Sequence, residues 1–214
     1  HRGGRLQALA IRGVPGADTT NWDERLMSAG DSRAVEWIDL EAIHNPDNDL
    51  AARAVAAGAA NFTRGEGCWF GQGELFFCAT NGGPERIGQI WRYRPSRFEG
   101  YAQETEEPGT LELFVETNDE RVLEKCDNIP VAPCGDLIVV EDGDAEQFIR
   151  GVTPERRLYT IGRNAARESD GEYSEITGPC FSPDGATLFF NVQRGPGRTF
   201  AVRGPWAQRS LSAV

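Results

Sequence analysis

Acidic and amide side chains stand at the start of three similar segments of the sequence. Glu66 opens the first, Asp127 and Asn128 open the second, and Glu175 opens the third, followed by Thr177. Calcium and other hard cations, including iron(III), prefer such oxygen donors. Carboxylates held close together repel one another unless a proton or a cation neutralises them. The pattern therefore predicts a hard-cation site if the segments converge, whereas otherwise each acid makes a local turn or caps its own strand.

Two arginines are candidates for contacting a phosphate group. Arg64 precedes Glu66 by two positions, a spacing that places both side chains on one face of a strand. The planar guanidinium can bind two phosphate oxygens while nearby cations neutralise the others. A plain ion pair between Arg64 and Glu66 explains the same spacing. Arg163, which Asn164 follows, is a second candidate for binding substrate.

A pair of acids closes the second segment. Glu141 and Asp142 stand at the end of its apolar run, beside Gly143. They are either ligands at the far end of the strand or a solvated turn. Glu141 is retained as a candidate metal ligand.

The three segments share a pattern that predicts how these side chains are positioned. Each passes from its acidic start through a short apolar stretch and a glycine turn into a strand of large apolar residues. The turn glycines Gly73, Gly135 and Gly185 recur at intervals of 62 and 50 residues, close to the ~40–50 residues of a propeller blade. We expect an all-β fold, a β-propeller of which this chain holds three to four blades. The segment starts would then converge on the propeller axis.

The rest of the chain fits one partial propeller domain over residues 1–214. Residues 1–60 are expected to form a strand, loop and helix segment, with one short helix at 50–60 and Asp49 as its N-cap. Residues 61–214 are expected to hold the blade repeats. The predicted strands are 6–11, 34–40, 68–70, 74–80, 89–93, 111–116, 137–140, 157–161, 180–182, 187–191 and 199–203.

Composition excludes several classes of function. The formal net charge of -11 argues against nucleic acid as a partner, because phosphate backbones need a basic footprint. No apolar run approaches the ~20 residues of a transmembrane helix, so the chain is not expected to span a membrane. Both histidines, His1 and His44, lie outside the repeats, which disfavours a histidine-based catalytic triad.

Several phrases together resemble one known family. They are RGEGCW at 64–69, TNGG at 80–83, GQIWRY at 88–93, DN at 127–128, EDG at 141–143, EITG at 175–178, FSPDG at 181–185, TFAV at 199–202 and GPW at 204–206. In this order they resemble the C-terminal half of the PhoX-type alkaline phosphatases. The resemblance covers most of the chain after Asn61.

The resemblance implies a six-bladed propeller exported to the bacterial periplasm that hydrolyses phosphate monoesters. It also implies an iron(III) and calcium cluster on the propeller axis. Arg64 and Glu66 match the catalytic R-x-E phrase, so Arg64 would bind phosphate and Glu66 would hold metal. Asp127, Asn128 and Glu175 match polar positions near the cluster.

The sequence departs from the family pattern in its N-terminal part, which bears on whether this chain can form the whole metal cluster. The N-terminal half of the family supplies an iron-binding cysteine and further carboxylates, and no segment here matches that half. The role cannot be assigned to any of the five cysteines. We therefore expect the chain to be inactive alone and to need the missing half, or protein partners, to complete the propeller.

The sequence is compatible with three functions. The leading one is a metal-dependent phosphomonoesterase. The second is a non-catalytic propeller that serves as a scaffold or binding subunit of a larger extracytoplasmic assembly, because a fold does not fix a function. The third is a calcium-dependent hydrolase of the lactonase kind.

Overall fold

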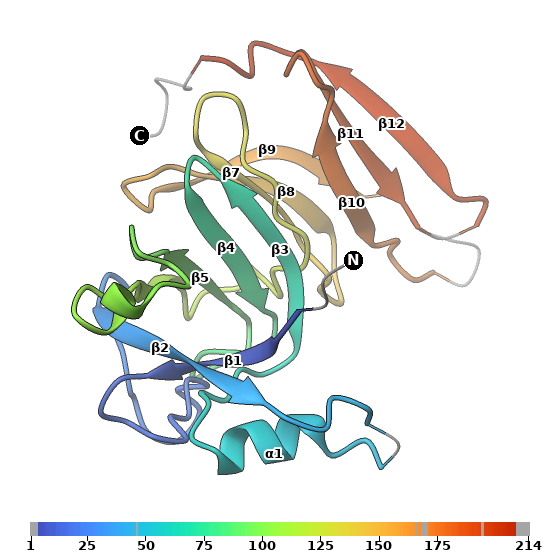
Figure 1. Cartoon of the computed structure of the whole chain (residues 1–214). Coiled ribbons are helices and arrows are strands. Elements are labelled where there is room, and N and C mark those ends of the chain that lie inside the picture. The colour runs from blue at the N-terminus through green and yellow to red at the C-terminus, as the bar shows by residue number, and fades with distance from the viewer. Residues whose placement is uncertain (1–3, 46, 166, 168–170, 194, 209–214) are drawn as a thin grey trace.

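A computed structural model describes residues 4–45, 47–165, 167, 171–193 and 195–208 (Figure 1). Over these residues the chain forms twelve β-strands, one α-helix and one 3₁₀ helix. The all-β class expected from the sequence is therefore confirmed. None of the helices in the described residues is both long and apolar enough to cross a membrane.

The strands form three antiparallel sheets, of which the first is the largest. It has six strands in the order β1-β2-β6-β5-β4-β3. Its strands are β1 (Leu6–Ile11), β2 (Ser32–Leu40), β3 (Gly65–Gly71), β4 (Glu74–Ala79), β5 (Gln89–Arg94) and β6 (Thr110–Glu116). Because β2 pairs with β6 through Ser32, Arg33 and Ala34, the first sixty residues extend the sheet built by the repeats.

The other two sheets have three strands each and follow one another along the chain. Their strands are β7 (Leu137–Val140), β8 (Gln147–Val152) and β9 (Leu158–Asn164), and then β10 (Ile176–Phe181), β11 (Thr187–Val192) and β12 (Arg198–Arg203). The sequence did not indicate β8, since the buried Arg150 and Gly151 interrupt its apolar pattern. In Figure 1 the β7–β9 sheet lies between the β3–β4 hairpin and the β10–β12 sheet, in keeping with the packing of β7 against both.

Buried apolar clusters join each sheet to the next. Phe76, Ile90 and Phe114 of the first sheet pack with Leu137 and Val139 of β7. A second cluster places Ile138 and Val140 of β7 against residues of β10 and β11. Since alternate side chains of β7 point to opposite faces, this one strand is buried on both sides and fixes the sheets relative to one another.

The three repeated segments form three corresponding hairpins. The turn at Gly73 joins β3 to β4, and the turn at Gly185 joins β10 to β11. In the middle repeat, residues 127–131 run beside β7 around Gly135, with Val140 N–H donating to the Asn128 carbonyl at 3.1 Å. In each hairpin the acidic residues stand at the open end, opposite the turn.

The single α-helix, α1 (Leu50–Ala56), is shorter than the expected 50–60. Gly58 stops it by adopting a φ of 107°, a left-handed conformation that closes many helices. Asp49 occupies the N-cap position without making a side-chain cap. Instead Asn45 Oδ1 accepts hydrogen bonds from the backbone N–H groups of Asp49 and Leu50, at 2.7 and 2.9 Å.

Candidate functional site

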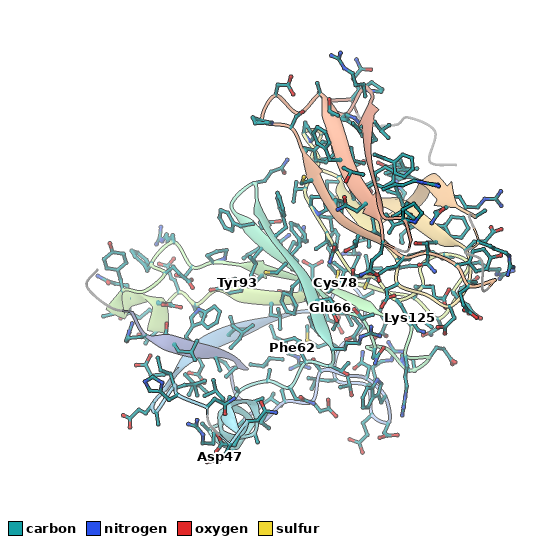
Figure 2. The ribbon with its side chains drawn as sticks, turned by 90° about the vertical axis from the view of Figure 1, so that its right-hand side faces the viewer. Asp47, Phe62, Glu66, Cys78, Tyr93 and Lys125 are labelled. Carbon is teal, nitrogen blue, oxygen red and sulfur yellow. The ribbon has the colours of Figure 1, made fainter. Side chains whose placement is uncertain are left out.

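Glu66 lies on β3 (Figure 2), and the local backbone there is irregular. Arg64 has a φ of 43°, which is uncommon for a residue other than glycine. The pairing of β3 with β4 shifts register between Gly65 and Cys68. Glu66 therefore lies in a β-bulge, a feature that redirects side chains and is frequent beside active sites.

Gly67 brings this bulge against the loop that carries Asp127. Its N–H donates to the Asp127 carbonyl oxygen at 2.8 Å. A Cβ at this position would lie 2.4 Å from that oxygen and 2.6 Å from the Asn128 Cα. Only glycine permits the contact, and the contact places Glu66 and Asp127, which are far apart in the sequence, in adjacent backbone segments.

Arg64 bridges two acids of this region. Its Nη2 lies 2.8 Å from Asp142 Oδ2, and its Nε lies 3.5 Å from Glu66 Oε1. The ion pair between Arg64 and Glu66, which was the other explanation for their spacing in the sequence, is therefore present. It is looser than the pair with Asp142. All three side chains remain partly exposed, so the guanidinium is accessible to a ligand.

The pKa values of two carboxyls indicate that the acids act on one another. Burial raises the pKa of Asp127 to about 6, the negative charges of Glu66 and Asp142 add to the increase, and Arg64 opposes it. Burial also raises the pKa of Glu175, with further contributions from Asp142 and Asp127. A group of carboxylates that repel one another in this way is electrostatically suited to binding a cation.

Asn128 connects the second hairpin to the third. Its Oδ1 accepts hydrogen bonds from Gly178 N–H at 2.7 Å and from Thr177 Oγ1 at 3.1 Å. The register of β10 and β11 shifts between Thr177 and Cys180, which gives a second bulge beside Glu175. Through these contacts Asn128 positions the start of β10, and its side-chain oxygen is already occupied.

Glu141 makes contacts of a different kind. Its side chain is buried, and Oε1 lies 2.8 Å from Nε of the buried Arg150. Backbone N–H groups of Glu124 and Phe148 donate to its two oxygens, each at 3.1 Å. Burial raises the pKa of Glu141, and Arg150 opposes the increase. These contacts assign Glu141 to the folding of the second sheet and give no support to the expected metal-ligand role.

We therefore predict that Glu141→Gln destabilises the protein without weakening cation binding. Breaking a buried ion pair leaves an uncompensated charge on Arg150 and costs about 3–5 kcal/mol. The free energy of unfolding, measured by urea denaturation, should fall by about that amount. The double variant Glu141→Leu with Arg150→Met should recover most of the loss, since it removes both charges. A stable Glu141→Gln protein with weakened calcium binding would contradict this prediction and support the expected metal-ligand role of Glu141.

The turn after β7 contains residues that the sequence analysis did not select. Asp142 takes part in the cluster, and Asp144 lies 2.8 Å from the Nζ of Lys125. Lys125 has a φ of 47°, like Arg64 outside the usual region. The two aspartates of the Asp-Gly-Asp segment at 142–144 thus form ion pairs with two basic side chains, Arg64 and Lys125. Two features of the sequence could have identified this turn: the two aspartates separated by one residue, and the lysine two positions before Asp127.

Arg163 on β9 pairs with Glu146, with Nη1 and Oε2 3.0 Å apart, and both side chains are partly exposed. Its expected contact with a substrate stays a prediction. The convergent set thus consists of Arg64, Glu66, Asp127, Asn128, Asp142 and Glu175.

The cluster fits a hard cation by its chemistry. Its carboxylates provide only oxygen ligands. Burial and then the charges of Glu66 and Asp142 raise the pKa of Asp127, and a bound cation would relieve the repulsion among these charges. Within the described ranges, no three Asp, Glu, His or Cys side chains already form a group that could hold a metal ion. Cation binding would therefore require these side chains to move closer together or further ligands to join them.

Comparison with models of known protein families gives a match over most of the chain. A family model described as alkaline phosphatase PhoX matches residues 1–197 of the chain. No curated protein and no solved structure matches. The family match begins at the first residue, so it includes the sixty residues in which the sequence phrases had shown no resemblance.

Proposed function

This chain belongs to the alkaline phosphatase PhoX family, and we propose that its cluster of acids and Arg64 is part of the active site of a metal-dependent phosphomonoesterase. The family assignment supports an alkaline phosphatase-like function. The observation that carries the proposal is the convergence of Arg64, Glu66, Asp127 and Glu175 from three hairpins. It supplies both a guanidinium and repelling carboxylates.

The fold proposal follows from the same hairpins. We propose that the three sheets are consecutive blades of a β-propeller, with six blades by family resemblance. Residues 65–71, 127–131 and 176–181 would be their innermost strands. In support, these segments carry the cluster at corresponding ends. We also propose, on the family resemblance alone, a periplasmic location for the protein.

Each cluster residue has a proposed role. Glu66, Asp127 and Glu175, with Asp142, would hold calcium and iron(III), which when bound would supply positive charge to the phosphoryl oxygens. Arg64 would exchange its contacts with Asp142 and Glu66 for two hydrogen bonds to the phosphate and thereby orient it. Asn128 would keep the third hairpin, and so Glu175, in place through its bonds to Thr177 and Gly178.

The test is hydrolysis of p-nitrophenyl phosphate by the full-length protein. We expect activity that is lost on chelation and restored by calcium together with iron(III). A metal-replete, correctly folded protein without phosphatase activity would support the scaffold alternative. Hydrolysis of a sugar lactone with calcium alone would support the lactonase alternative. Either result would overturn the phosphatase proposal.

We predict that the affinity for calcium falls as the pH is lowered through about 6, because a proton on Asp127 competes with the cation. The apparent affinity should decrease up to about tenfold for each pH unit below that value if one proton is displaced. Calcium titrations by calorimetry between pH 5 and pH 8, compared with Asp127→Asn, would measure this. A pH-independent affinity in the parent protein would contradict the role of Asp127.

Protonation of Asp127 weakens calcium binding, but it stabilises the fold of the cation-free protein. The pKa of Asp127 is higher in the folded chain than its usual value of about 3.9. Ionisation of Asp127 therefore destabilises the fold, with no penalty below about pH 4, an increasing penalty up to about pH 6 and a full penalty above it. Asp127→Asn should accordingly raise the melting temperature of the cation-free protein at pH 7.5 while removing its stabilisation by calcium.

A further inference from the structure

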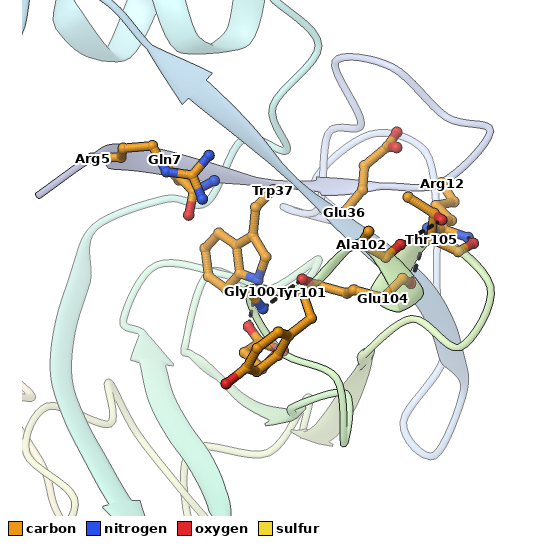
Figure 3. A pocket seen from close by; sticks show the side chains of 11 residues that line it. Arg5, Gln7, Arg12, Glu36, Trp37, Gly100, Tyr101, Ala102, Glu104 and Thr105 are labelled. Atoms are coloured by element: carbon orange, nitrogen blue, oxygen red, sulfur yellow. Dashed lines mark hydrogen bonds between the residues drawn. The ribbon is translucent and has the colours of Figure 1, made fainter.

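A pocket lies apart from the candidate active site, between β1, β2 and the segment that contains the 3₁₀ helix Ala102–Thr105 (Figure 3). Its volume is about 580 Å³, which is within the usual range for small-molecule sites. Two aromatic and several charged side chains line it, namely Arg5, Arg12, Glu36, Trp37, Tyr101 and Glu104. No residue of the acidic cluster is among the lining residues.

The indole of Trp37 is held in a fixed orientation in this pocket. Its N–H donates to Glu99 Oε1 at 2.7 Å and lies 3.1 Å from the Tyr93 hydroxyl. The ring also packs edge-on against Tyr93, with centroids 5.5 Å apart. Because its polar atom is already engaged, Trp37 offers the pocket an apolar ring surface. Tyr101, 72% exposed, provides a second aromatic ring at the rim (Figure 3).

Charged groups of both signs surround these rings. Arg12 Nη1 and Nη2 donate to the carbonyl oxygens of Thr105 and Glu104, at 2.8 and 3.4 Å, and its Nε is buried. Arg5 pairs with Asp39 at 3.2 Å. On the acidic side, Glu104 accepts a hydrogen bond from the Gly100 N–H at 2.9 Å, and Glu99 lies beside Trp37. The exposed Glu36 points away from the Trp37 ring (Figure 3). The wall therefore contains both hydrogen-bond donors and acceptors.

This combination discriminates between classes of ligand. An anion would meet Glu99 and Glu104, and a cation would meet Arg5 and Arg12, so neither is matched to the whole wall. A hydroxyl group can both donate and accept hydrogen bonds, and the C–H face of a sugar ring is apolar. We propose that this pocket binds a neutral pyranose sugar, with one ring face on Trp37 and its hydroxyls towards Arg12 and Glu104.

The probe is cellobiose, a neutral disaccharide of two pyranose rings, with saturation-transfer NMR and calorimetry on the full-length protein as the measurements. We expect saturation transfer to the ring protons and a dissociation constant on the order of 1 mM or lower. Tyr101→Ala and Glu104→Gln should each weaken binding about 3- to 10-fold. Trp37→Ala should weaken it more, and Tyr101→Ala keeps the test valid if that variant fails to fold.

Matched controls separate the pocket from the surface as a whole. Phe70→Ala removes another exposed aromatic ring, 62% exposed on β3, and should leave the affinity for cellobiose unchanged. Glu66→Gln should also leave the affinity for cellobiose unchanged. The sugar-binding proposal is therefore tested independently of the phosphatase function. The proposal is overturned by absence of saturation transfer at about 10 mM cellobiose, by equal losses in Phe70→Ala, or by inorganic phosphate or choline binding here in place of the sugar.

Discussion

Replacing Glu66 with glutamine is expected to abolish metal retention and to reduce phosphatase activity by on the order of 10²–10³-fold. The substitution keeps the shape of the side chain and removes its charge. The affinity of an oxygen-ligand site depends on the number of charged ligands, and Glu66 is one of the acids whose charges raise the pKa of Asp127. Hydrolysis of p-nitrophenyl phosphate and the calcium retained after gel filtration would be measured on the same sample.

Glu107→Gln is the matched control for this change. Glu107 is also a partly exposed glutamate paired with an arginine, Arg97, and it lies outside the cluster. That variant should retain metal and activity. A Glu66→Gln protein that is fully active and metal-replete would refute the assignment. Because the repulsion with Asp127 is weaker in it, cation-free Glu66→Gln should melt no lower than the parent, which separates a binding defect from unfolding.

Replacing Arg64 with alanine is expected to lower kcat/KM by on the order of 10²–10³-fold while leaving the bound metals in place. Arg64 contacts two acids of the cluster, but its own proposed ligand is the phosphate. Arg64→Lys should recover only part of the loss, because an ammonium lacks the planar fork that binds two oxygens. Steady-state kinetics and competition by inorganic phosphate would be measured together with metal content.

The control for Arg64 is Arg121→Ala. Arg121 is also an exposed arginine in an ion pair, with Asp119 at 2.7 Å, and its loss should leave kcat/KM unchanged. An Arg64→Ala variant with parental kcat/KM would contradict phosphate binding by Arg64. An Arg64→Ala variant that loses its metals as completely as Glu66→Gln would instead assign Arg64 to holding the carboxylates together.

The repeat was sufficient to find much of the cluster. Glu66, Asp127 and Glu175 were selected because their segments share a glycine turn, and the hairpins do place them at corresponding ends. The resemblance to the family depended on the same phrases. The sequence pattern predicts these hairpins because a hairpin is a local structure. Its turn residues and its apolar alternation are both found in one stretch of consecutive residues.

What the sequence could not resolve depends on long-range packing. Glu141 and Asp142 are adjacent acids, and only the pairing of β7 with its neighbours shows that one meets the buried Arg150 and the other Arg64. Likewise, the addition of β2 to β6 across about seventy residues of chain rests on three backbone pairs. Their side chains, Ser32, Arg33 and Ala34, carry no pattern that identifies a partner.

The central claim, that three hairpins contribute to one cation-dependent phosphatase site, is tested most directly by elemental analysis of the full-length protein as purified. The account predicts bound iron and calcium in active protein, and loss of both in Glu66→Gln. Phosphatase activity in a protein that contains neither metal would contradict the account, as would unchanged metal content in Glu66→Gln.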